Sequence, residues 1–366
     1  MKLSLSREDL LTPLQRVIGA VEKRQTMPVL SHVLIALQDG TLSLTATDLE
    51  IELTDSVHGV QGDNGQTTLP ARKLFDICKT LPDGAEVALS VSSNKATLKA
   101  GRSRFSLSTL SASEFPRADA LESPVLFSLP QRALRGVLQK TAFSMALQDV
   151  RYYLNGLLLE LGPGNLRAVT TDGHRLSLSE HPVEIALDSQ HQAIVPRKGV
   201  QELLRLLSDD DGDVQVAMTP NHVQFTLGDL RYTSKLIDGR FPDYQRVMPS
   251  ENPLVATIDR DTLKQALSRV AILANEKYKG VRLQFGKDVL TVQTHNPEQE
   301  DAEDEIAIGF DGNSIEIGFN VGYVLDVLQA IDCETVLFKL NDGNSSALVT
   351  AADDDNHRYV VMPMRL

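Results

Sequence analysis

Several residue types are scarce in this sequence, and each scarcity excludes a class of protein. The 366 residues include no tryptophan, two cysteines and only 5% aromatic residues. Cys78 and Cys333 lie 255 positions apart, which excludes a disulfide framework and a cysteine-based zinc site. No apolar run approaches the roughly 20 residues of a membrane-spanning helix. The first residues lack an apolar stretch with a cleavage site, so we expect no signal peptide and a reducing, cytoplasmic setting.

Positive charge is also in short supply. Lys and Arg number 36 against 49 Asp and Glu, a formal net charge of -13. This balance argues against a protein that grips nucleic acid through its overall field. Hydrophobic content of 42% and charged content of 23% are ordinary for a globular protein and exclude disorder. The length predicts roughly two to four domains.

The chain repeats itself. Three alternating strand patterns run into Asp48, Asp172 and Asn296, which are spaced 124 residues apart. Each pattern predicts a strand that enters a turn, because Asp and Asn side chains bond their own backbone. The last strand of each copy begins with matching dipeptides, Arg104-Phe105, Arg231-Tyr232 and Arg358-Tyr359.

Two amphipathic helices are predicted in each copy. The first carries paired leucines, which are Leu10 and Leu14, Leu134 and Leu138, and Leu263 and Leu267. Start signals precede them at Ser6, Ser128 and Asp259, and Pro13 is expected to kink the first helix. The second helix is predicted over 71–78, 197–204 and 321–328. The simplest layered solution is three tandem α+β domains, 1–120, 126–249 and 252–366, each with helices on an antiparallel sheet.

The charges are unevenly distributed. Basic residues gather on the predicted helices, whereas acidic residues cluster in candidate loops at 209–213, 298–305 and 353–355. One interpretation is a set of solvated helix faces and loops. The other is that the helices line one positive surface suited to the phosphates of duplex DNA, with the sheets facing outward. The acidic run 298–305 can solvate a loop, bind a cation or pair with a basic surface.

Catalytic motifs are missing. Asp172 and His174 invite a hydrolase interpretation, but the first copy has Leu49 and Glu50 after Asp48, and no activated nucleophile accompanies them. No metal-binding or nucleotide-binding motif occurs, so we expect no enzyme, no metal and no cofactor. Tyr152 and Tyr153 are expected on a strand, facing opposite sides, with one core and the other exposed. The apolar C-terminus is expected to form a last strand, to line a groove, or both.

Six motifs carry a resemblance to a known family over the whole chain. They are Arg151–Gly156, Thr171–Leu176, Val195–Val200, Asp238–Tyr244, Ile317–Val321 and Val360–Leu366. The sequence resembles the bacterial sliding clamp, the β subunit of DNA polymerase III. The resemblance implies three clamp domains per chain and a head-to-tail homodimer that closes a six-domain ring. Such a ring is a non-catalytic, cytoplasmic and nucleoid-associated processivity factor that encircles duplex DNA independently of its sequence.

The resemblance also implies a groove between the second and third domains, which binds short apolar peptides from the polymerase III α subunit, the clamp loader, other polymerases and repair proteins. This candidate groove comprises Leu154, Thr171, Gly173, His174, Arg175, Leu176, Pro242, Arg246, Val247, Tyr278, Asn320, Tyr323, Ser346, Val360, Val361, Met362, Pro363 and Met364. Two positions depart from the family pattern. Tyr278 stands where Phe is familiar, and Asn344 makes one subsite more polar where Val is familiar.

Two further residue sets follow from the resemblance. The DNA contacts are Arg24, Arg72, Gln148, Tyr152, Tyr153, Arg197 and Lys198. The dimer contacts are Arg102, Arg104, Phe105 and Leu107 on the first domain, facing Ile272, Leu273, Glu298, Glu300 and Glu303 on the third. Three alternatives stay open: a monomeric peptide-binding scaffold, a hydrolase built around Asp172 and His174, and a DNA-binding regulator that reads bases.

Overall fold

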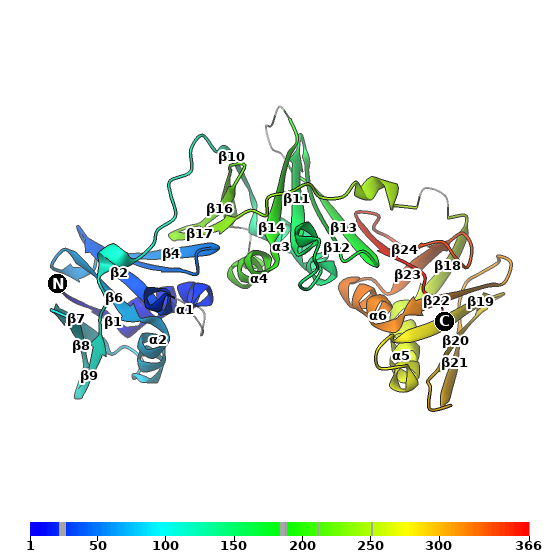
Figure 1. The fold of residues 1–366 in the computed structure, drawn as a ribbon, viewed down its shortest axis with the longest axis horizontal. Coiled ribbons are helices and arrows are strands. Elements are labelled where there is room, and N and C mark those ends of the chain that lie inside the picture. Colours follow the sequence, from blue (N-terminus) through cyan, green and yellow to red (C-terminus); the bar gives the residue numbers. More distant parts are fainter. Residues whose placement is uncertain (22–26, 184–186, 188, 211, 250–251, 366) are drawn as a thin grey trace. The chain divides into compact units, whose positions relative to one another are not determined.

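The computed structural model describes residues 1–21, 27–183, 187, 189–210, 212–249 and 252–365 (Figure 1). Arg24, which is one of the expected DNA contacts, lies outside these residues. Contacts divide the chain into two compact units. The first unit combines Met1–Arg132 with Gln201–Leu236, and the second combines Ala133–Val200 with Ile237–Leu366.

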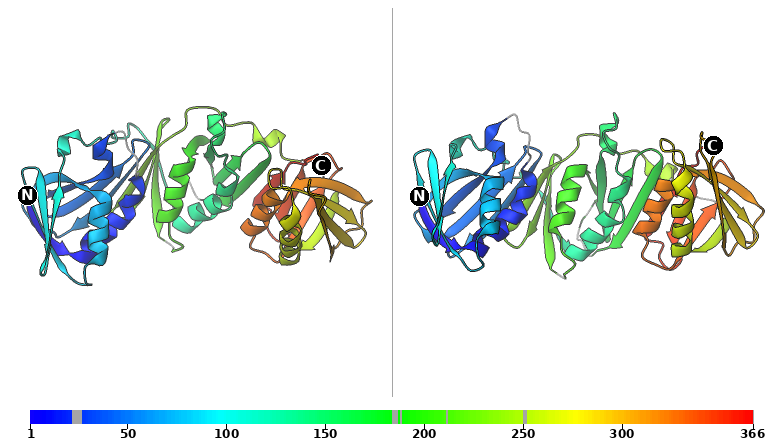
Figure 2. Two further views of the ribbon diagram at one scale, coloured as in Figure 1. Left: turned by 60° about the horizontal axis from the view of Figure 1, so that its bottom comes forward. Right: turned by 90° about the horizontal axis from the view of Figure 1, so that it is seen from below.

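The predicted helices form, two in each copy. They are α1 (Arg7–Val17), α2 (Ala71–Thr80), α3 (Gln131–Gln139), α4 (Arg197–Leu206), α5 (Arg260–Val270) and α6 (Val321–Ala330). The leucine pairs on α1, α3 and α5 are all buried, as their helical spacing predicts. In the first unit α1 and α2 lie side by side, and in the second α5 and α6 do so (Figure 2).

Two of the three predicted start signals cap their helices. Ser6 Oγ accepts the Asp9 backbone N–H at 3.0 Å, and Asp259 Oδ1 accepts that of Thr262 at 2.7 Å. The prediction for Ser128 was wrong, because Ser128 lies inside a strand that runs on to Pro130. The backbone N–H of Gln131 instead donates to the Gly212 carbonyl at 2.9 Å. Helix α1 continues through the buried Pro13, so the proline does not end it.

Each copy contributes two antiparallel half-sheets of four strands, and within each half-sheet the strands are named in the order in which they pair. One half-sheet of the first copy comprises β1 (Lys2–Ser6), β7 (Glu86–Ser92), β8 (Lys95–Ala100) and β9 (Ser103–Ser108), with the short strand β5 (Gln61–Gly62) beyond β1. The other comprises β6 (Gly65–Pro70), β2 (His32–Gln38), β3 (Thr41–Thr47) and β4 (Ile51–His58). In the second copy they are β10 (Val125–Pro130), β15 (Asp213–Met218), β16 (His222–Leu227) and β17 (Leu230–Lys235), and β14 (His191–Pro196), β11 (Gly156–Gly162), β12 (Asn165–Thr171) and β13 (Arg175–Pro182). In the third copy they are β18 (Leu254–Asp259), β23 (Thr335–Leu340), β24 (Ala347–Ala351) and β25 (His357–Val361), and β22 (Ile315–Asn320), β19 (Gly280–Gly286), β20 (Val289–His295) and β21 (Asp301–Ala307).

Neighbouring copies are joined by strand pairing. Within the first unit, β17 pairs with β4 and places Arg231 opposite Thr54. Within the second unit, β25 pairs with β13 and places Arg358 opposite Leu178. The two arginines begin matching dipeptides, and Thr54 and Leu178 each lie six residues after the repeated aspartate. The two joints therefore have the same register, and each fuses two half-sheets into one sheet of eight strands.

The half-sheet of the third copy shows why these strands form. In β19, Val281, Leu283 and Phe285 are fully buried, whereas Arg282 and Gln284 lie on the other face. This period-two alternation is typical of a sheet with one face on the core. The inward residues join α5 and α6 in one apolar cluster.

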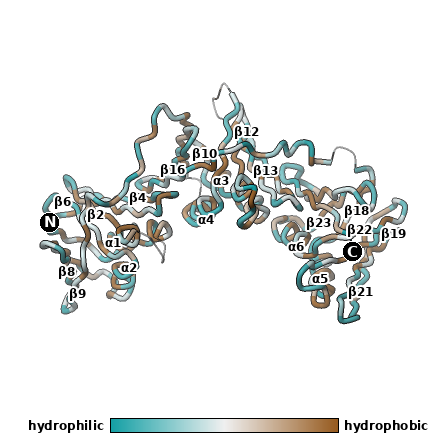
Figure 3. The backbone as a smooth tube through the Cα atoms, in the orientation of Figure 1, coloured by the Kyte–Doolittle hydropathy of each residue, from teal (hydrophilic) through white to brown (hydrophobic). Residues whose placement is uncertain are grey.

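Two segments differ from their predicted structure. Tyr152 and Tyr153 lie in a 3-10 turn, Tyr152–Leu154, and not in a strand. The acidic run at 298–305 is only partly a loop, because Asp301 begins strand β21 at the edge of its sheet. Figure 3 shows the hydrophilic colouring of β21. Ala302, Asp304 and Ile306 are the less exposed positions of β21, and the density of acidic side chains obscured this alternation in the sequence.

The predicted Asp and Asn turns are confirmed. Asp48 Oδ1 accepts the backbone N–H groups of Glu50 and Ile51 at 2.9 and 2.8 Å. Asp172 Oδ1 accepts those of His174 and Arg175 at 2.9 and 3.0 Å. Asn296 Oδ1 accepts the N–H of Glu300 at 2.9 Å, one residue further on, so the third turn is one residue longer.

The two serines provide a matched test of the helix caps. We expect Ser6→Ala to lower the free energy of opening of α1 by about 1 kcal/mol, because the N-cap acceptor is lost. We expect Ser128→Ala to leave the opening of α3 unchanged. Hydrogen exchange of the amides in each helix measures both values. Equal effects in the two helices would contradict the assignment of the caps.

Candidate functional site

All members of the candidate groove lie in the second unit. They come from the 3-10 turn Tyr152–Leu154, the adjoining ends of β12 and β13 with the turn between them, the segment 242–247, the loop at Tyr278, the end of β22 with the start of α6, the turn at Ser346, and the end of β25 with the chain that follows it. Leu176 and Val360 are directly paired across β13 and β25 and belong to one buried apolar cluster. The joint between the second and third copies therefore brings these segments together.

Arg175 holds the floor of this joint. Its Nε bonds Asp172 at 3.1 Å, its Nη1 bonds Asp326 at 2.6 Å, and its Nη2 donates to the Phe143 carbonyl at 2.9 Å. The guanidinium carbon also lies 4.4 Å from the ring centre of Tyr323. Arg175 is 9% exposed, and every guanidinium nitrogen has a partner. It therefore ties β13 to α6.

The C-terminal segment lies over the same joint. The Met362 backbone N–H donates to the His174 carbonyl at 2.9 Å, and that of Met364 donates to the Gly318 carbonyl at 2.8 Å. Ser346 Oγ contacts Met362 Sδ at 3.3 Å. Val360 and Val361 are fully buried in β25, whereas Met362 to Met364 are half-buried. The C-terminus thus forms a last strand and then contributes partly open apolar side chains.

The segment 238–249, which we call the strap, supplies Pro242, Arg246 and Val247. Its Phe241 and Tyr244 are each 7% exposed and pack in the cluster that contains Leu176 and Val360. Pro242 and Arg246 are exposed, and Arg246 Nε pairs with Asp243 at 2.9 Å. In the strap, Phe241 and Tyr244 therefore point into the core, whereas Pro242 and Arg246 point to solvent.

Sequence reasoning missed a buried charged network below the strap. Glu160 is 4% exposed and accepts three hydrogen bonds, from the Tyr244 hydroxyl, from Arg167 Nη1 at 3.1 Å and from Gln192 Nε2 at 2.6 Å. Arg167 Nε reaches Glu180 at 3.0 Å. Burial, with the adjacent Glu160, raises the pKa of Tyr244 to about 12. The signal in the sequence was a lone glutamate in the otherwise apolar strand Gly156–Leu161.

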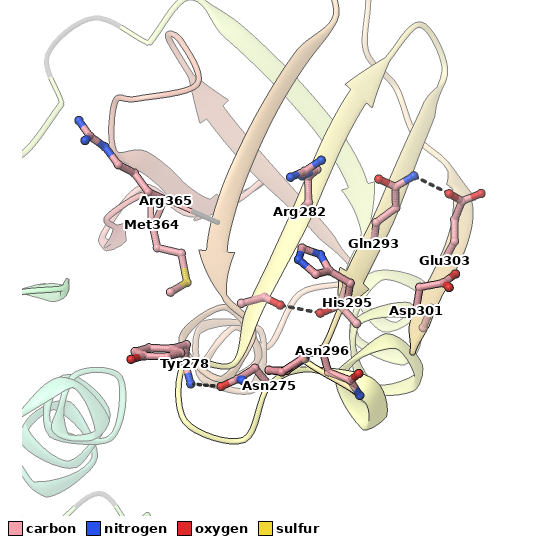
Figure 4. Close-up of a pocket in the computed structure, with 14 residues that line it drawn as sticks. Asn275, Tyr278, Arg282, Gln293, His295, Asn296, Asp301, Glu303, Met364 and Arg365 are labelled. Carbon is pink, nitrogen blue, oxygen red and sulfur yellow. Dashed lines mark hydrogen bonds between the residues drawn. The ribbon is translucent and has the colours of Figure 1, made fainter. Parts of the chain in front are cut away.

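A cavity of about 640 Å³ adjoins the groove residues Tyr278 and Met364 (Figure 4). It lies on the outward face of the third-copy half-sheet, where Arg282, Gln293 and His295 form its floor. Tyr278 is 57% exposed, and Asn320 Nδ2 donates to its carbonyl at 3.3 Å. Asn344 is exposed on a turn, where its N–H donates to Asp342 at 2.8 Å.

Asp172 and His174 are not arranged for catalysis. Asp172 binds two backbone N–H groups and Arg175, whereas the His174 ring stacks on Tyr323 with ring centres 6.4 Å apart. A general base needs an orienting partner and a nucleophile within hydrogen-bond reach. The cluster that invited a hydrolase interpretation therefore builds the turn between β12 and β13 and a ring contact with α6.

The expected DNA contacts do not all lie in one unit. Arg72 is in the first unit, where it donates to the Val21 carbonyl at 2.7 Å. Tyr152 is 57% exposed, whereas Tyr153 packs against a buried cluster. Arg197 Nη1 donates to the Met145 carbonyl at 2.8 Å, and burial lowers its pKa. The remaining contacts are Gln148, which is exposed, and Lys198, which is half-buried.

The expected dimer contacts lie at opposite ends of the chain. Arg102 and Arg104 are exposed on and beside β9, with Phe105 half-buried and Leu107 buried. In the second unit, Ile272 is 78% exposed, Leu273 is half-buried, and Glu298, Glu300 and Glu303 are exposed. Strands β9 and β21 are both edge strands of their sheets.

Metal-ligating clusters and membrane-spanning helices are both missing from the part of the chain that the structure describes. No group of three or more His, Cys, Asp or Glu side chains is placed to hold a metal ion there. No helix among the described residues is long and apolar enough to cross a membrane.

The threefold α+β repeat, with half-sheets fused at its joints, defines a clamp-type protein. Three family models cover the chain: the DNA polymerase III beta subunit N-terminal domain (residues 1–119), central domain (128–243) and C-terminal domain (245–365). The chain belongs to this family, the bacterial beta sliding clamps, whose members are non-catalytic processivity factors.

Relatives match over essentially their whole length. The Pseudomonas aeruginosa beta sliding clamp is 51% identical over 367 residues and covers 100% of both chains. A crystal structure of the Pseudomonas aeruginosa clamp bound to griselimycin has a TM-score of 0.97, with 51% identity and 100% of both chains covered. The Caulobacter crescentus clamp with bound polyethylene glycol has a TM-score of 0.95 at 38% identity, covering 100% of this chain and 99% of that one. The resemblance drawn from the six motifs is confirmed, as is the α+β clamp fold.

The role of Arg175 can be tested against a neighbouring arginine. We expect Arg175→Lys to lower the opening free energy of β13 and α6 by about 1–3 kcal/mol, because a single compact ammonium cannot reach the three partners that the separate guanidinium nitrogens reach. Arg246→Lys changes only an exposed ion pair and should have no measurable effect. Hydrogen exchange of both elements measures this. An Arg175→Lys protein with wild-type exchange would contradict the structural role.

Proposed function

We propose that this DNA sliding clamp acts as a head-to-tail homodimer that encircles duplex DNA in the cytoplasm, close to the nucleoid. Its three domains would be 1–120, 126–249 and 252–366. It would tether the polymerase III α subunit, the clamp loader, other polymerases and repair proteins through short apolar peptides. The observation that carries the proposal is the repeated joint, which leaves one matching strand edge at each end of the chain.

The dimer follows from the repeat. At both internal joints the last strand of one copy pairs with the strand after the repeated turn of the copy before it. The first copy has such a last strand, β9, and the third has such a receiving strand, β21, and each is a sheet edge. Exposed edges invite pairing with another chain. A second copy supplies the missing neighbour to each, and two heterologous contacts close a ring.

The internal joints also predict the register of this contact. Thr54 and Leu178 lie opposite Thr45 and Val169 of the preceding strand, and the equivalent residue in the third copy is Glu303, opposite Gln293. Arg104 would therefore face Glu303 of the partner subunit. The pattern of exposure agrees, because both side chains are exposed, whereas the next pair, Phe105 and Ala302, is half-buried. A slip of one residue would place apolar side chains against charges.

A charge exchange tests this register. We expect Arg104→Glu and Glu303→Arg each to raise the dimer dissociation constant about tenfold, because like charges then meet across the interface. The double variant should restore dimerisation in sedimentation equilibrium. Lys95→Glu, which changes an exposed residue on the neighbouring strand β8, serves as the control. Failure of the double variant to recover would contradict the predicted register.

Encirclement explains how a protein with a negative net charge can stay on DNA. A ring that holds DNA topologically does not need a strong attractive field, and phosphate-level contacts permit sliding where base contacts would hinder it. The basic helix residues, with Tyr152 as the more exposed tyrosine, are suited to such loose contacts. The proposal assigns these contacts to Arg24, Arg72, Gln148, Tyr152, Tyr153, Arg197 and Lys198.

Retention on DNA of different topology tests the whole proposal. The protein is loaded with its clamp loader and ATP onto nicked circular DNA, half of the sample is linearised, and both are separated by gel filtration. We expect the protein to stay on circles and to leave after linearisation, because a ring slides off free ends. Equal retention would indicate ordinary DNA binding, as for a regulator. Retention on neither form of DNA, with a loader of confirmed activity, would favour the monomeric scaffold. The double substitution Ile272→Ala and Leu273→Ala should abolish the function of a clamp but leave the function of such a scaffold intact.

The groove is proposed to bind apolar peptide anchors. Pro242, Val247, Met362 and Met364 offer apolar side chains that are partly open to solvent, and methionines adapt to varied shapes. Arg246, at 85% exposure of its side chain, is available to orient a peptide. The Pseudomonas aeruginosa clamp binds griselimycin, which supports a ligand site in this family.

A further inference from the structure

The buried network of Glu160, Arg167, Glu180 and Tyr244 has an internal reference in the first copy. Glu160 lies opposite Arg167, and Arg167 lies opposite Glu180, across β11, β12 and β13. The equivalent strands β2, β3 and β4 place Ala36 opposite Ser43 and Ser43 opposite Ser56 in the same register. Three charged positions are thus replaced by small neutral residues without any change in strand pairing.

The strap differs at the matching place as well. Phe115 and Pro116 of the first copy correspond to Phe241 and Pro242, and Phe115 is likewise buried at 5% exposure. The position of Tyr244 is occupied by Ala118, whose backbone N–H donates to Glu52 at 2.7 Å. The fold therefore builds a joint and its strap without the network. The network is therefore not needed for strand pairing or for the turn of the strap.

The candidate groove is what distinguishes the second joint. Tyr244 Oη donates to Glu160 and accepts from Arg167 Nη1 at 2.9 Å, so its hydroxyl is held from two sides. A cavity of about 360 Å³, lined in part by Tyr244, Gln245 and Met248, lies against this end of the strap. Tyr244 is the buried residue of the turn Tyr244–Arg246, so its two hydroxyl bonds and the packing of its ring together hold the start of that turn.

We propose that Tyr244, held by Glu160 and Arg167, is a positioning residue for partner binding: it fixes the strap so that Pro242, Arg246 and Val247 stand at the edge of the groove. The inference rests on the proposed function of that groove. A hydrogen bond to a buried carboxylate is worth more than a neutral one, because the charged acceptor has lost its water. Tyr244 does not itself touch the peptide.

The test uses the full-length protein and a fluorescein-labelled peptide carrying the clamp-binding segment of the polymerase III α subunit. We expect Tyr244→Phe, which keeps the ring and removes the hydroxyl, to raise the peptide Kd about tenfold. Gln245→Ala, an exposed neighbour in the same turn, should leave the Kd unchanged. Wild-type retention on circular DNA by the Tyr244→Phe protein shows that the ring is intact.

A double-mutant cycle separates positioning from general stability. If Tyr244 acts through the strap, Arg246→Ala will cost much less in Tyr244→Phe than in wild type, because Arg246 is already misplaced. Additive effects would overturn the proposal, and so would an unchanged Kd for Tyr244→Phe. A wild-type protein that retains DNA but fails to bind the peptide would instead overturn the groove itself.

A second variant guards against loss of folding. A variant with four substitutions gives the second joint the residues found at these positions of the first: Glu160→Ala, Arg167→Ser, Glu180→Ser and Tyr244→Ala. The first joint shows that strands with these residues pair in the same register. We expect this variant to keep the dimer and its retention on circular DNA, and to bind the peptide at least about tenfold more weakly. Wild-type peptide affinity in this variant would overturn the proposal.

Discussion

The pairing of β-strands across the joints is the constraint on which the rest of the structure depends. Each copy has two half-sheets, and a half-sheet edge exposes a row of backbone N–H and C=O groups. The chain pairs two such edges at each internal joint, β17 with β4 and β25 with β13, in the same register. One edge of each kind then remains, β9 and β21, and the proposed dimer rests on these two edges.

The same backbone register supports different chemistry at the two joints. The first joint has a cavity of about 230 Å³ lined by Glu50, Glu52, Arg117 and Lys235, among others. Burial raises the pKa of Glu52, whose carboxylate accepts the backbone N–H of Ala118 in the segment that corresponds to the strap. The second joint has His174, Leu176, Asp243 and Met362 at the corresponding places. The two joints thus share a backbone register and differ in the side chains that it presents.

Much of the fold could be predicted because its signals are local. Helix spacing, the caps at Ser6 and Asp259, and the Asp48 and Asp172 turns depend on residues a few positions apart. Ser128 misled because its strand satisfies its backbone through β15, where Ser128 lies opposite Gln215, a residue far away in sequence. Tyr152 and Tyr153 misled because strand preference is weak against the local geometry of a 3-10 turn.

The sequence by itself determined the threefold repeat, the helices and turns of each copy, and, through its motifs, the family. Those properties follow from periodicity and short-range chemistry. The tertiary structure decided which charges are used and how. Only it shows that Arg175 binds Asp326 across 151 residues, and that Tyr244 reaches Glu160 across 84. Such long-range pairs depend on which strands lie next to each other, and local sequence patterns do not determine that pairing.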